Sequence, residues 1–270
     1  MRNDYSKYQD YWQIISETTG YDFSGYSISS LNQKLEKFIS YERIGSAEEL
    51  RDKIYTDRLS QEMLLGKLLT NNTEFFRDAN FFRSLRDKVL IHLATHPEIN
   101  IWIAGCSTGE EAYSVAILLD ELKLLNRCQI VATDINQTNI EIADRGIYSL
   151  QKAKACSMRY FKAGGTQKFS NYYTAYYDQV VFQERLHSQI TFMQHDLTSD
   201  PSLRRFHLVL CRNVLFYLNE FNQRRVTKAI ADNIYSYGYL CFGTSEVVAL
   251  SDDMDLNAVD RKNNIFRKEI

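Results

Sequence analysis

The sequence predicts an α/β protein in which a doubly wound sheet carries a small antiparallel β insertion and follows an all-α N-terminal domain. Three observations predict this class. Apolar residues recur at helical spacing over residues 5–69, short β-rich runs alternate with helical patterns after Asn100, and residues 146–192 hold two strand-length runs rich in tyrosine and valine. We therefore expect a helical domain at 1–70, a linker and connecting helix at 71–98, and an α/β domain at 99–270 with the insertion at about 150–190.

The N-terminal region shows the period of amphipathic helices and no alternating strand pattern. Leu31, Leu35 and Phe38 form one such apolar stripe. Serine is a favoured N-cap, because its hydroxyl can accept a hydrogen bond from a free backbone N–H group of the first turn. Ser29 and Ser46 precede helical patterns and mark two expected helix starts.

Beyond Asn100 the pattern is typical of parallel strands joined by crossover helices. The strand-like runs are INIWIAG, QIVATDI, FHLVLCRN, YLCFGTS and NIFRKEI, and the helical patterns cover residues 110–124, 138–144 and 220–235. The run NYYTAYYDQVVFQERL predicts the antiparallel insertion.

Composition argues against several classes of function. The 32 Lys and Arg residues against 34 Asp and Glu residues leave a formal charge of −2, so no global field attracts nucleic acid or an anionic membrane. No apolar run approaches the roughly 18 residues of a membrane span, and the N-terminus is no signal peptide, so we expect a soluble, cytoplasmic protein. The five cysteines form no CxxC pair and the five histidines no HExxH motif, so we expect reduced cysteines and no metal site.

The stretch AGCSTGEEAYS has the spacing of a strand-to-helix turn that binds a nucleotide, with Gly105, Ser107 and Gly109 at the key positions. Glu110 and Glu111 follow directly, and two carboxylates would repel a phosphate there. S-adenosylmethionine suits the turn better, because it carries an ammonium and a sulfonium but no phosphate. The alternative for Glu110 is a first-turn acid that points into solvent and favours the helix dipole.

Two further acidic positions follow predicted strands. Asp134 lies 25 residues after Gly109 (134 − 109), near the interval of roughly 20 at which an acid accepts ribose hydroxyls. Its alternative role is the N-cap of the next helix. Asp196 and Leu197 follow the strand ITFMQ and could bracket the adenine, with Asp196 accepting from its amino group.

Several stretches together resemble the CheR family of chemotaxis methyltransferases, which use S-adenosylmethionine to methylate glutamates of chemoreceptors. The matching stretches are NNTEFFRD, AGCSTGEEAYS, ATDI, ADRGIYS, HDL, CRNVLFYL and GTSE, in the order of that family and spanning roughly residues 71–246. The resemblance implies a Rossmann-like methyltransferase sheet.

The resemblance also implies site residues. Together with Gly105 of the turn, the residues expected to bind the cofactor are Asn71, Thr73, Arg77, Glu111, Asp134, Asp196, Leu197, Arg212 and Asn213. Tyr217 would lie beside the transferred methyl group. The sequence departs from the family at Ala112, where proline is usual, and at Asp196, where asparagine is common, which leaves the adenine contact open.

The expected chemistry needs positioning groups rather than a base, because a glutamate with a pKa of about 4.3 is already a nucleophile at neutral pH. Arg77, Arg212 and Tyr217 are the predicted catalytic residues: an arginine orients the carboxylate, and Tyr217 presents its hydroxyl dipole. The alternatives are a surface ion pair between Arg77 and Asp78, an aromatic staple for TEFF, and core packing for Phe216 and Tyr217. The sequence does not say which of these two faces the cleft.

Two other functions remain open at this stage: a methyltransferase acting on a nucleobase or small molecule, and a non-catalytic adaptor with the same fold. The resemblance favours methyl transfer to the cytoplasmic helical region of chemoreceptors, with S-adenosylhomocysteine as the product. In that family the N-terminal helices dock on the receptor bundle, and some members grip a receptor peptide with the β insertion. We expect a monomer that binds no nucleic acid and does not insert into a membrane.

Overall fold

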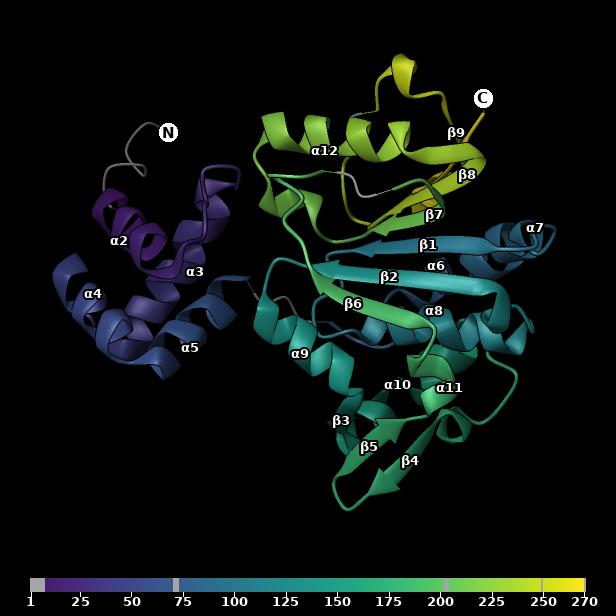
Figure 1. Cartoon of the computed structure of the whole chain (residues 1–270), viewed down its shortest axis with the longest axis horizontal. Coiled ribbons are helices and arrows are strands. Elements are labelled where there is room, and N and C mark those ends of the chain that lie inside the picture. Colours follow the sequence, from purple (N-terminus) through teal and green to yellow (C-terminus); the bar gives the residue numbers. More distant parts are fainter. Residues whose placement is uncertain (1–7, 70–72, 202–203, 249, 270) are drawn as a thin grey trace. The chain divides into compact units, whose positions relative to one another are not determined.

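A computed structural model describes residues 8–69, 73–201, 204–248 and 250–269 (Figure 1). The chain divides into two compact units. The helical unit contains the residues before 71 together with Phe216–Gln223, and the α/β unit contains the rest. Segment 216–223 lies in the 99–270 region of the sequence, but it groups with the helices because Ser27 N donates to Tyr217 O (2.6 Å) and Asn219 N donates to Gly25 O (3.1 Å).

Four described helices form the helical unit: α2 (Gln9–Thr19), α3 (Ile28–Glu42), α4 (Ala47–Thr56) and α5 (Arg58–Leu69). The expected start at Ser46 is confirmed, since its Oγ accepts from Glu49 N (3.1 Å). The other start lies two residues earlier than expected, because the N-cap of α3 is Ser27 and not Ser29. Leu31 and Leu35 of the predicted stripe are buried.

The α/β unit is built on a seven-stranded sheet of order β6-β2-β1-β7-β8-β10-β9 (Figure 1). Its strands are β1 (Ile99–Ala104), β2 (Cys128–Asp134), β6 (Ile190–Gln194), β7 (Phe206–Cys211), β8 (Ile234–Phe242), β9 (Leu256–Asp260) and β10 (Ile265–Lys268). β6, β2, β1, β7 and β8 pair in parallel, whereas β10 is antiparallel to both β8 and β9. The doubly wound class is therefore confirmed, and β9 is a strand that the sequence pattern did not predict.

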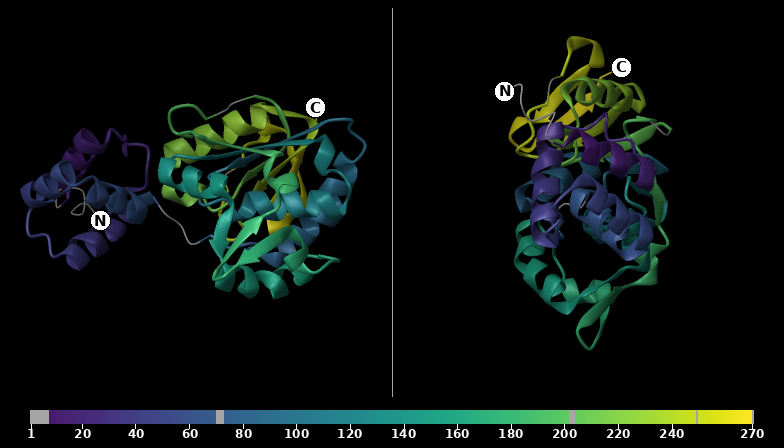
Figure 2. Two further views of the ribbon diagram at one scale, coloured as in Figure 1. Left: turned by 60° about the horizontal axis from the view of Figure 1, so that its bottom comes forward. Right: turned by 90° about the vertical axis from the view of Figure 1, so that its left-hand side faces the viewer.

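The insertion is a second, three-stranded antiparallel sheet of order β3-β5-β4, visible as a projecting hairpin in Figure 2. Its elements are β3 (Ile147–Ser149), α10 (Leu150–Lys162), β4 (Tyr173–Tyr176), β5 (Gln179–Phe182) and α11 (Glu184–His187). It begins slightly before the expected residue 150, because Ile147 already pairs with Val181. The helix α10 was not predicted.

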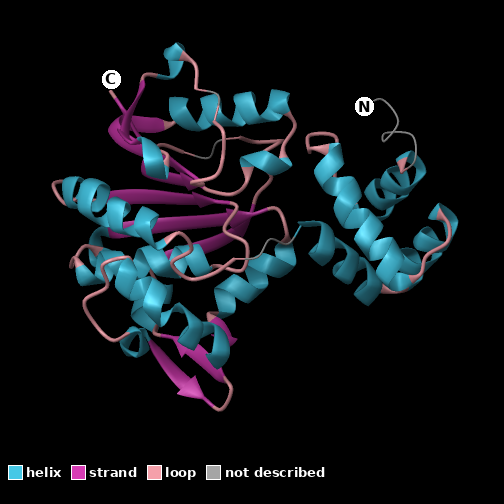
Figure 3. Ribbon diagram, turned by 180° about the vertical axis from the view of Figure 1, so that it is seen from behind, coloured by secondary structure: helices cyan, strands magenta, loops and turns pink. Residues whose placement is uncertain are grey.

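Helices cover both faces of the large sheet. Figure 1 shows α12 (Glu220–Asp232) on one side of the central strands and α8 (Glu110–Glu121) with α9 (Gln137–Arg145) on the other, and Figure 3 shows the same arrangement from behind. Both α8 and α12 end three residues before the expected limits, and β8 already begins at Ile234. Before β1 the chain forms α6 (Ala79–Leu85), a π-helical stretch (Arg86–Leu90) and α7 (Ile91–Leu93).

The remaining composition-based expectations concern cysteines, membranes and metals. All five cysteines are free and buried, which is as expected for reduced core residues. No described helix has the length and apolar character needed to cross a bilayer. Within residues 8–69, 73–201, 204–248 and 250–269 there is also no cluster of three His, Cys, Asp or Glu side chains that could hold a metal ion.

Candidate active site

The candidate site lies where the strand order of the sheet reverses. β1 and β7 are neighbours in the sheet, but the chain continues from β1 toward β2 and from β7 toward β8. In open α/β sheets ligands bind outside the carboxyl ends of the strands at such a point. The glycine-containing turn follows β1 directly, and Arg212 and Asn213 follow β7, so the topology brings two of the predicted motifs to one place.

The turn after β1 depends on left-handed backbone conformations. Gly105 has φ 75° and Gly109 has φ 93°, and Ser107 adopts φ 50° although it carries a side chain. A Cβ on Gly105 would lie 2.3 Å from Val214 Cγ2, so only glycine fits there. The N–H groups of Gly105 and Cys106 both donate to Thr133 O, at 2.7 and 2.8 Å, and so fix the turn against the end of β2.

Asp134 connects the end of β2 to this turn. Its Oδ2 accepts from Ser107 N (2.9 Å), and its Oδ1 accepts from Asn136 N (2.9 Å) and Asn139 Nδ2 (3.2 Å). The N-cap of α9 is Asn136, whose Oδ1 accepts from Thr138 N (2.9 Å), so the alternative role of Asp134 as helix cap is wrong. Burial raises the pKa of Asp134, and its hydrogen bonds act in the opposite direction.

Arg212 is held between two carboxylates that come from different parts of the sequence. Its side chain is fully buried, with Nη1 2.5 Å from Glu111 Oε2 and Nη2 2.8 Å from Asp78 Oδ2. The guanidinium also lies 3.9 Å from the ring centre of Phe81. Burial raises the pKa of Glu111, while the charges of Arg212 and Arg77 act in the opposite direction. We call Asp78, Glu111 and Arg212 the arginine triad.

Glu110 differs from both sequence-based interpretations. Its side chain is 0% exposed, so it does not point into solvent. It forms an ion pair with Lys152 of α10, and Thr108 Oγ1 donates to both of its carboxylate oxygens (2.9 and 2.8 Å). Lys152 therefore compensates the charge of Glu110, and Arg212 pairs with Glu111. The cofactor contact expected for Glu111 stays a prediction.

The segment before α6 is anchored by buried aromatic side chains. Phe75 and Phe76 are 0% exposed, which confirms the staple interpretation of TEFF. Phe76 N donates to Ser114 Oγ (3.0 Å), and Arg159 Nε donates to Phe75 O (3.1 Å). Thr73 and Arg77 flank this anchor and are half-buried. Asn71 lies outside the described residues.

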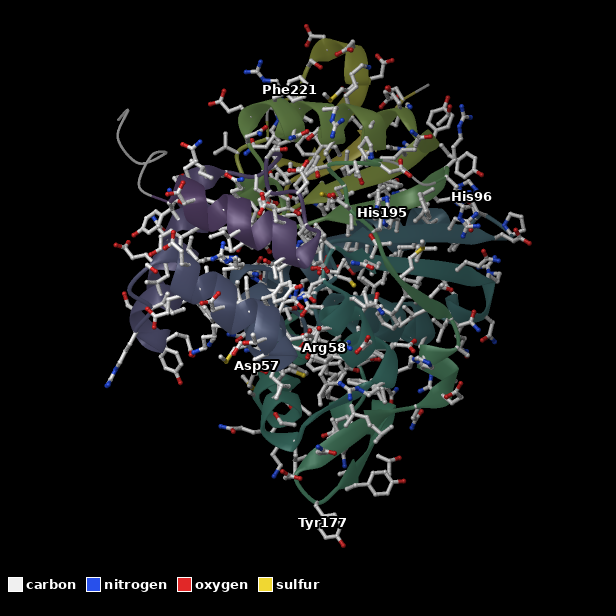
Figure 4. The ribbon with its side chains drawn as sticks, turned by 60° about the vertical axis from the view of Figure 1, so that its left-hand side comes forward. Asp57, Arg58, His96, Tyr177, His195 and Phe221 are labelled. Atoms are coloured by element: carbon white, nitrogen blue, oxygen red, sulfur yellow. The ribbon has the colours of Figure 1, made fainter. Side chains whose placement is uncertain are left out.

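The loop after β6 also contacts Asp134, since His195 N donates a hydrogen bond to the backbone oxygen of Asp134 (2.9 Å). Figure 4 labels His195, whose ring packs edge-on against Trp102 with ring centres 5.7 Å apart. Asp196 Oδ1 accepts from the N–H and the hydroxyl of Thr198, both at 2.8 Å, and Leu197 is buried. The adenine contact of Asp196 and Leu197 stays a prediction.

Glu246 is a residue of this site that the sequence argument left without a role. Its carboxylate accepts from the N–H groups of Asn213 (2.9 Å), Leu215 (2.9 Å) and Gly243 (2.6 Å), and so connects the loops after β7 and β8. Asn213 is left-handed there, with φ 59°. The only sequence signal was its place in the stretch GTSE.

Tyr217 belongs to the helical unit. Lys34 Nζ lies 4.4 Å from the centre of its ring. Phe216 is exposed and Tyr217 is half-buried. The catalytic role expected for Tyr217 stays a prediction.

Comparison with known proteins identifies the family. Residues 71–264 match the family model described as "CheR methyltransferase, SAM binding domain". The chain belongs to the CheR methyltransferase family. It is therefore an S-adenosylmethionine-dependent methyltransferase of the chemotaxis type, and the Rossmann-like fold expected from the resemblance is confirmed.

Individual CheR relatives agree with this assignment. A Pseudomonas putida protein named as a candidate methyltransferase, Cher3, is 37% identical over 92% of this chain and 91% of its own length. Chemotaxis protein methyltransferase 1 of Pseudomonas aeruginosa is 31% identical, covering 81% of each chain.

Among solved structures, the magnesium protoporphyrin IX methyltransferase of Synechocystis PCC 6803 is 15% identical over 74% of this chain and 86% of that chain, with a TM-score of 0.38.

The residues of the turn fit the CheR cofactor. Ser107 Oγ and Arg212 Nε are buried without a hydrogen-bond partner in the described part of the chain, which leaves polar atoms for a ligand at both strand ends. Asp134 accepts one hydrogen bond on Oδ2 and two on Oδ1, so one lone pair remains on Oδ2 for a hydroxyl group.

The raised pKa values predict that cofactor affinity depends on pH. Burial raises the pKa of Asp134 and Glu111 above the ordinary range of about 3.9 to 4.3. Both carboxylates then ionise as the pH rises through the raised values, so affinity for the cationic cofactor rises in this window.

The contribution of the two carboxylates to folding stability changes with pH in the opposite direction. It is fully present below about pH 4 and is lost as the pH rises through the folded-state pKa values.

Calorimetric titration with S-adenosylmethionine, from the ordinary carboxyl range at about pH 4 up to about pH 8, measures the binding effect. We expect the affinity of the wild type to increase with pH, and the Asp134→Asn variant to lose part of that increase. A wild-type affinity that stays constant over this range would contradict the prediction.

Proposed function

We propose that the chain transfers the methyl group of S-adenosylmethionine to glutamate side chains of chemoreceptors in the cytoplasm. The observation that carries the proposal is the arginine triad, because a fully buried arginine joins three of the family stretches. Asp78 comes from NNTEFFRD, Glu111 from AGCSTGEEAYS and Arg212 from CRNVLFYL. The chemotaxis names of the relatives support the receptor as substrate.

The proposed chemistry assigns positioning roles to the protein. When bound, S-adenosylmethionine supplies an electrophilic methyl group. A substrate glutamate is ionised at neutral pH and needs no general base. The protein therefore has to exclude water and hold the carboxylate in place, which is the role proposed for Arg77 and Tyr217. Asp134 and Glu111 hold the cofactor, and Arg212 fixes Glu111.

The helical unit offers a basic pocket for an acidic receptor surface. Lys34, Lys37 and Lys67 line a cavity of about 250 Å³ together with Phe38 and Tyr41. Glu42 of α3 forms an ion pair with Lys53 of α4. Burial lowers the pKa of Lys34 to about 8, so this lysine is still mostly protonated at neutral pH. A cavity lined by three lysines supports docking of the receptor helices there.

The proposal predicts base-labile methyl esters on the receptor. The chain would be incubated with methyl-labelled S-adenosylmethionine and the cytoplasmic helical fragment of a chemoreceptor, and the label would be followed before and after mild alkali. The matched control is the same fragment with its labelled glutamates replaced by alanine. Base-stable label would indicate N-methylation and a different substrate class. Absence of both label and cofactor binding would favour the non-catalytic adaptor.

A further inference from the structure

The β insertion contacts the cofactor turn through two side chains. Tyr148 of β3 donates its hydroxyl hydrogen bond to Thr108 O (2.7 Å), and Lys152 of α10 forms an ion pair with Glu110. Thr108 and Glu110 lie on either side of Gly109, the last glycine of the turn. Both contacts therefore hold the residues at which the turn ends and α8 begins.

In the ion pair between Lys152 and Glu110, the glutamate side chain is buried and the lysine side chain is partly exposed. The Glu110 side chain is 0% exposed, and within residues 8–69, 73–201, 204–248 and 250–269 Lys152 is its only ion-pair partner. A buried carboxylate without a cation is strongly unfavourable, so loss of Lys152 would force Glu110 toward water. Glu110 precedes Glu111 of the arginine triad directly, and a movement of Glu110 would displace Glu111 from Arg212.

Tyr148 restricts the same turn by packing. Gly109 is left-handed, and a Cβ there would lie 2.8 Å from both the Tyr148 hydroxyl and Ala143 Cβ. The Tyr148 ring is itself fixed edge-on against Phe75, with ring centres 4.9 Å apart, and Phe75 anchors the segment that carries Arg77. The insertion thus contacts two of the segments that form the site.

The start of α10 is rigidly placed within the insertion. Ser149 Oγ accepts from Lys152 N (3.2 Å) and caps the helix, and Tyr148 pairs with Val180 of β5. The turn between β4 and β5 is exposed: Figure 4 shows Tyr177 pointing away from the tip of this hairpin. A displacement of this small sheet would therefore reach Lys152 and Tyr148 together.

We propose that Lys152 and Tyr148 are positioning residues for the cofactor, so that the insertion forms part of the cofactor site as well as of any receptor contact. Lys152 acts through Glu110, and Tyr148 acts through Thr108. The turn keeps its left-handed conformation, and Glu111 keeps its partner Arg212, only while both contacts are made.

The test compares the affinity of purified full-length variants for S-adenosylmethionine by calorimetry. Lys152→Met removes the charge at similar length and should weaken binding about tenfold, whereas Lys152→Arg should stay within about threefold of the wild type. Lys154→Met, an exposed lysine on the same helix, is the matched control and should bind normally. Tyr148→Phe should weaken binding about threefold to tenfold.

A double variant separates positioning from a general loss of structure. Glu110→Gln combined with Lys152→Met leaves no uncompensated buried charge, so most of the affinity lost in Lys152→Met should return. The proposal is overturned if Lys152→Met binds as the wild type does, or if the double variant binds as weakly as Lys152→Met. A wild type that does not bind the cofactor would instead refute the methyltransferase function.

Discussion

Replacing Arg212 by methionine should reduce methyl transfer about 100-fold or more and lower the free energy of unfolding by about 3 to 5 kcal/mol. The guanidinium is fully buried between Glu111 and Asp78, so its removal leaves a buried carboxylate without its cation. Glu111 would then turn toward water or take up a proton, and either change removes a charge expected to bind the cofactor. Chemical denaturation measures the loss of stability, and a methyl-transfer assay with labelled S-adenosylmethionine measures the loss of turnover.

Two further variants make the Arg212 result interpretable. Arg212→Lys keeps the charge but loses the planar fork that reaches both carboxylates, so its affinity and stability should lie between those of the wild type and Arg212→Met. Arg204→Met is the matched control, because Arg204 is exposed and its guanidinium bonds only to Gln129 among the described residues. An Arg212→Met protein with wild-type stability and turnover would show that the arginine triad is not needed.

The second large effect is expected for Asp134→Asn. Both oxygens of Asp134 accept from N–H donors, with Ser107 N on Oδ2 and Asn136 N and Asn139 Nδ2 on Oδ1. An amide must therefore place its own NH2 group against a donor, whichever way it is turned. We expect kcat/KM to fall about 100-fold, and the free energy of unfolding to fall by about 1 to 3 kcal/mol from the unsatisfied group.

Asp144→Asn is the control for Asp134→Asn. Asp144 is a carboxylate of α9 with 63% of its side chain exposed, so its replacement should leave stability within about 0.5 kcal/mol of the wild type. Steady-state kinetics with varied S-adenosylmethionine should show the Asp134→Asn effect mainly as a higher KM for the cofactor. An unchanged KM in this variant would argue against a ribose contact by Asp134.

Local patterns in the sequence were sufficient for much of the fold. The alternation of strands and helices after Asn100 predicted the doubly wound sheet, and Ser46 predicted the start of α4. Patterns failed where neighbours in space decide the structure. The strand β9 has five residues, none of them buried, and it forms where β10 pairs with it in an antiparallel register. Segment 216–223 groups with the helices through backbone hydrogen bonds and through the amide groups of Asn219 and Asn222, whose partners Ser24 and Gly25 are distant in sequence.

By itself the sequence determined the chemistry available at the site. It showed a glycine turn after the first strand of the sheet, two carboxylates after this turn that disfavour a phosphate, and an acid at the end of the next strand. Only the tertiary structure decided which charges are neutralised. Lys152 lies 42 residues from Glu110, and Arg212 lies 101 residues from Glu111. The sheet order places β7 beside β1, and the insertion lies against α8, so these partners meet through topology. A buried carboxylate needs a cation in direct contact, and only the fold brings residues so far apart in sequence into contact.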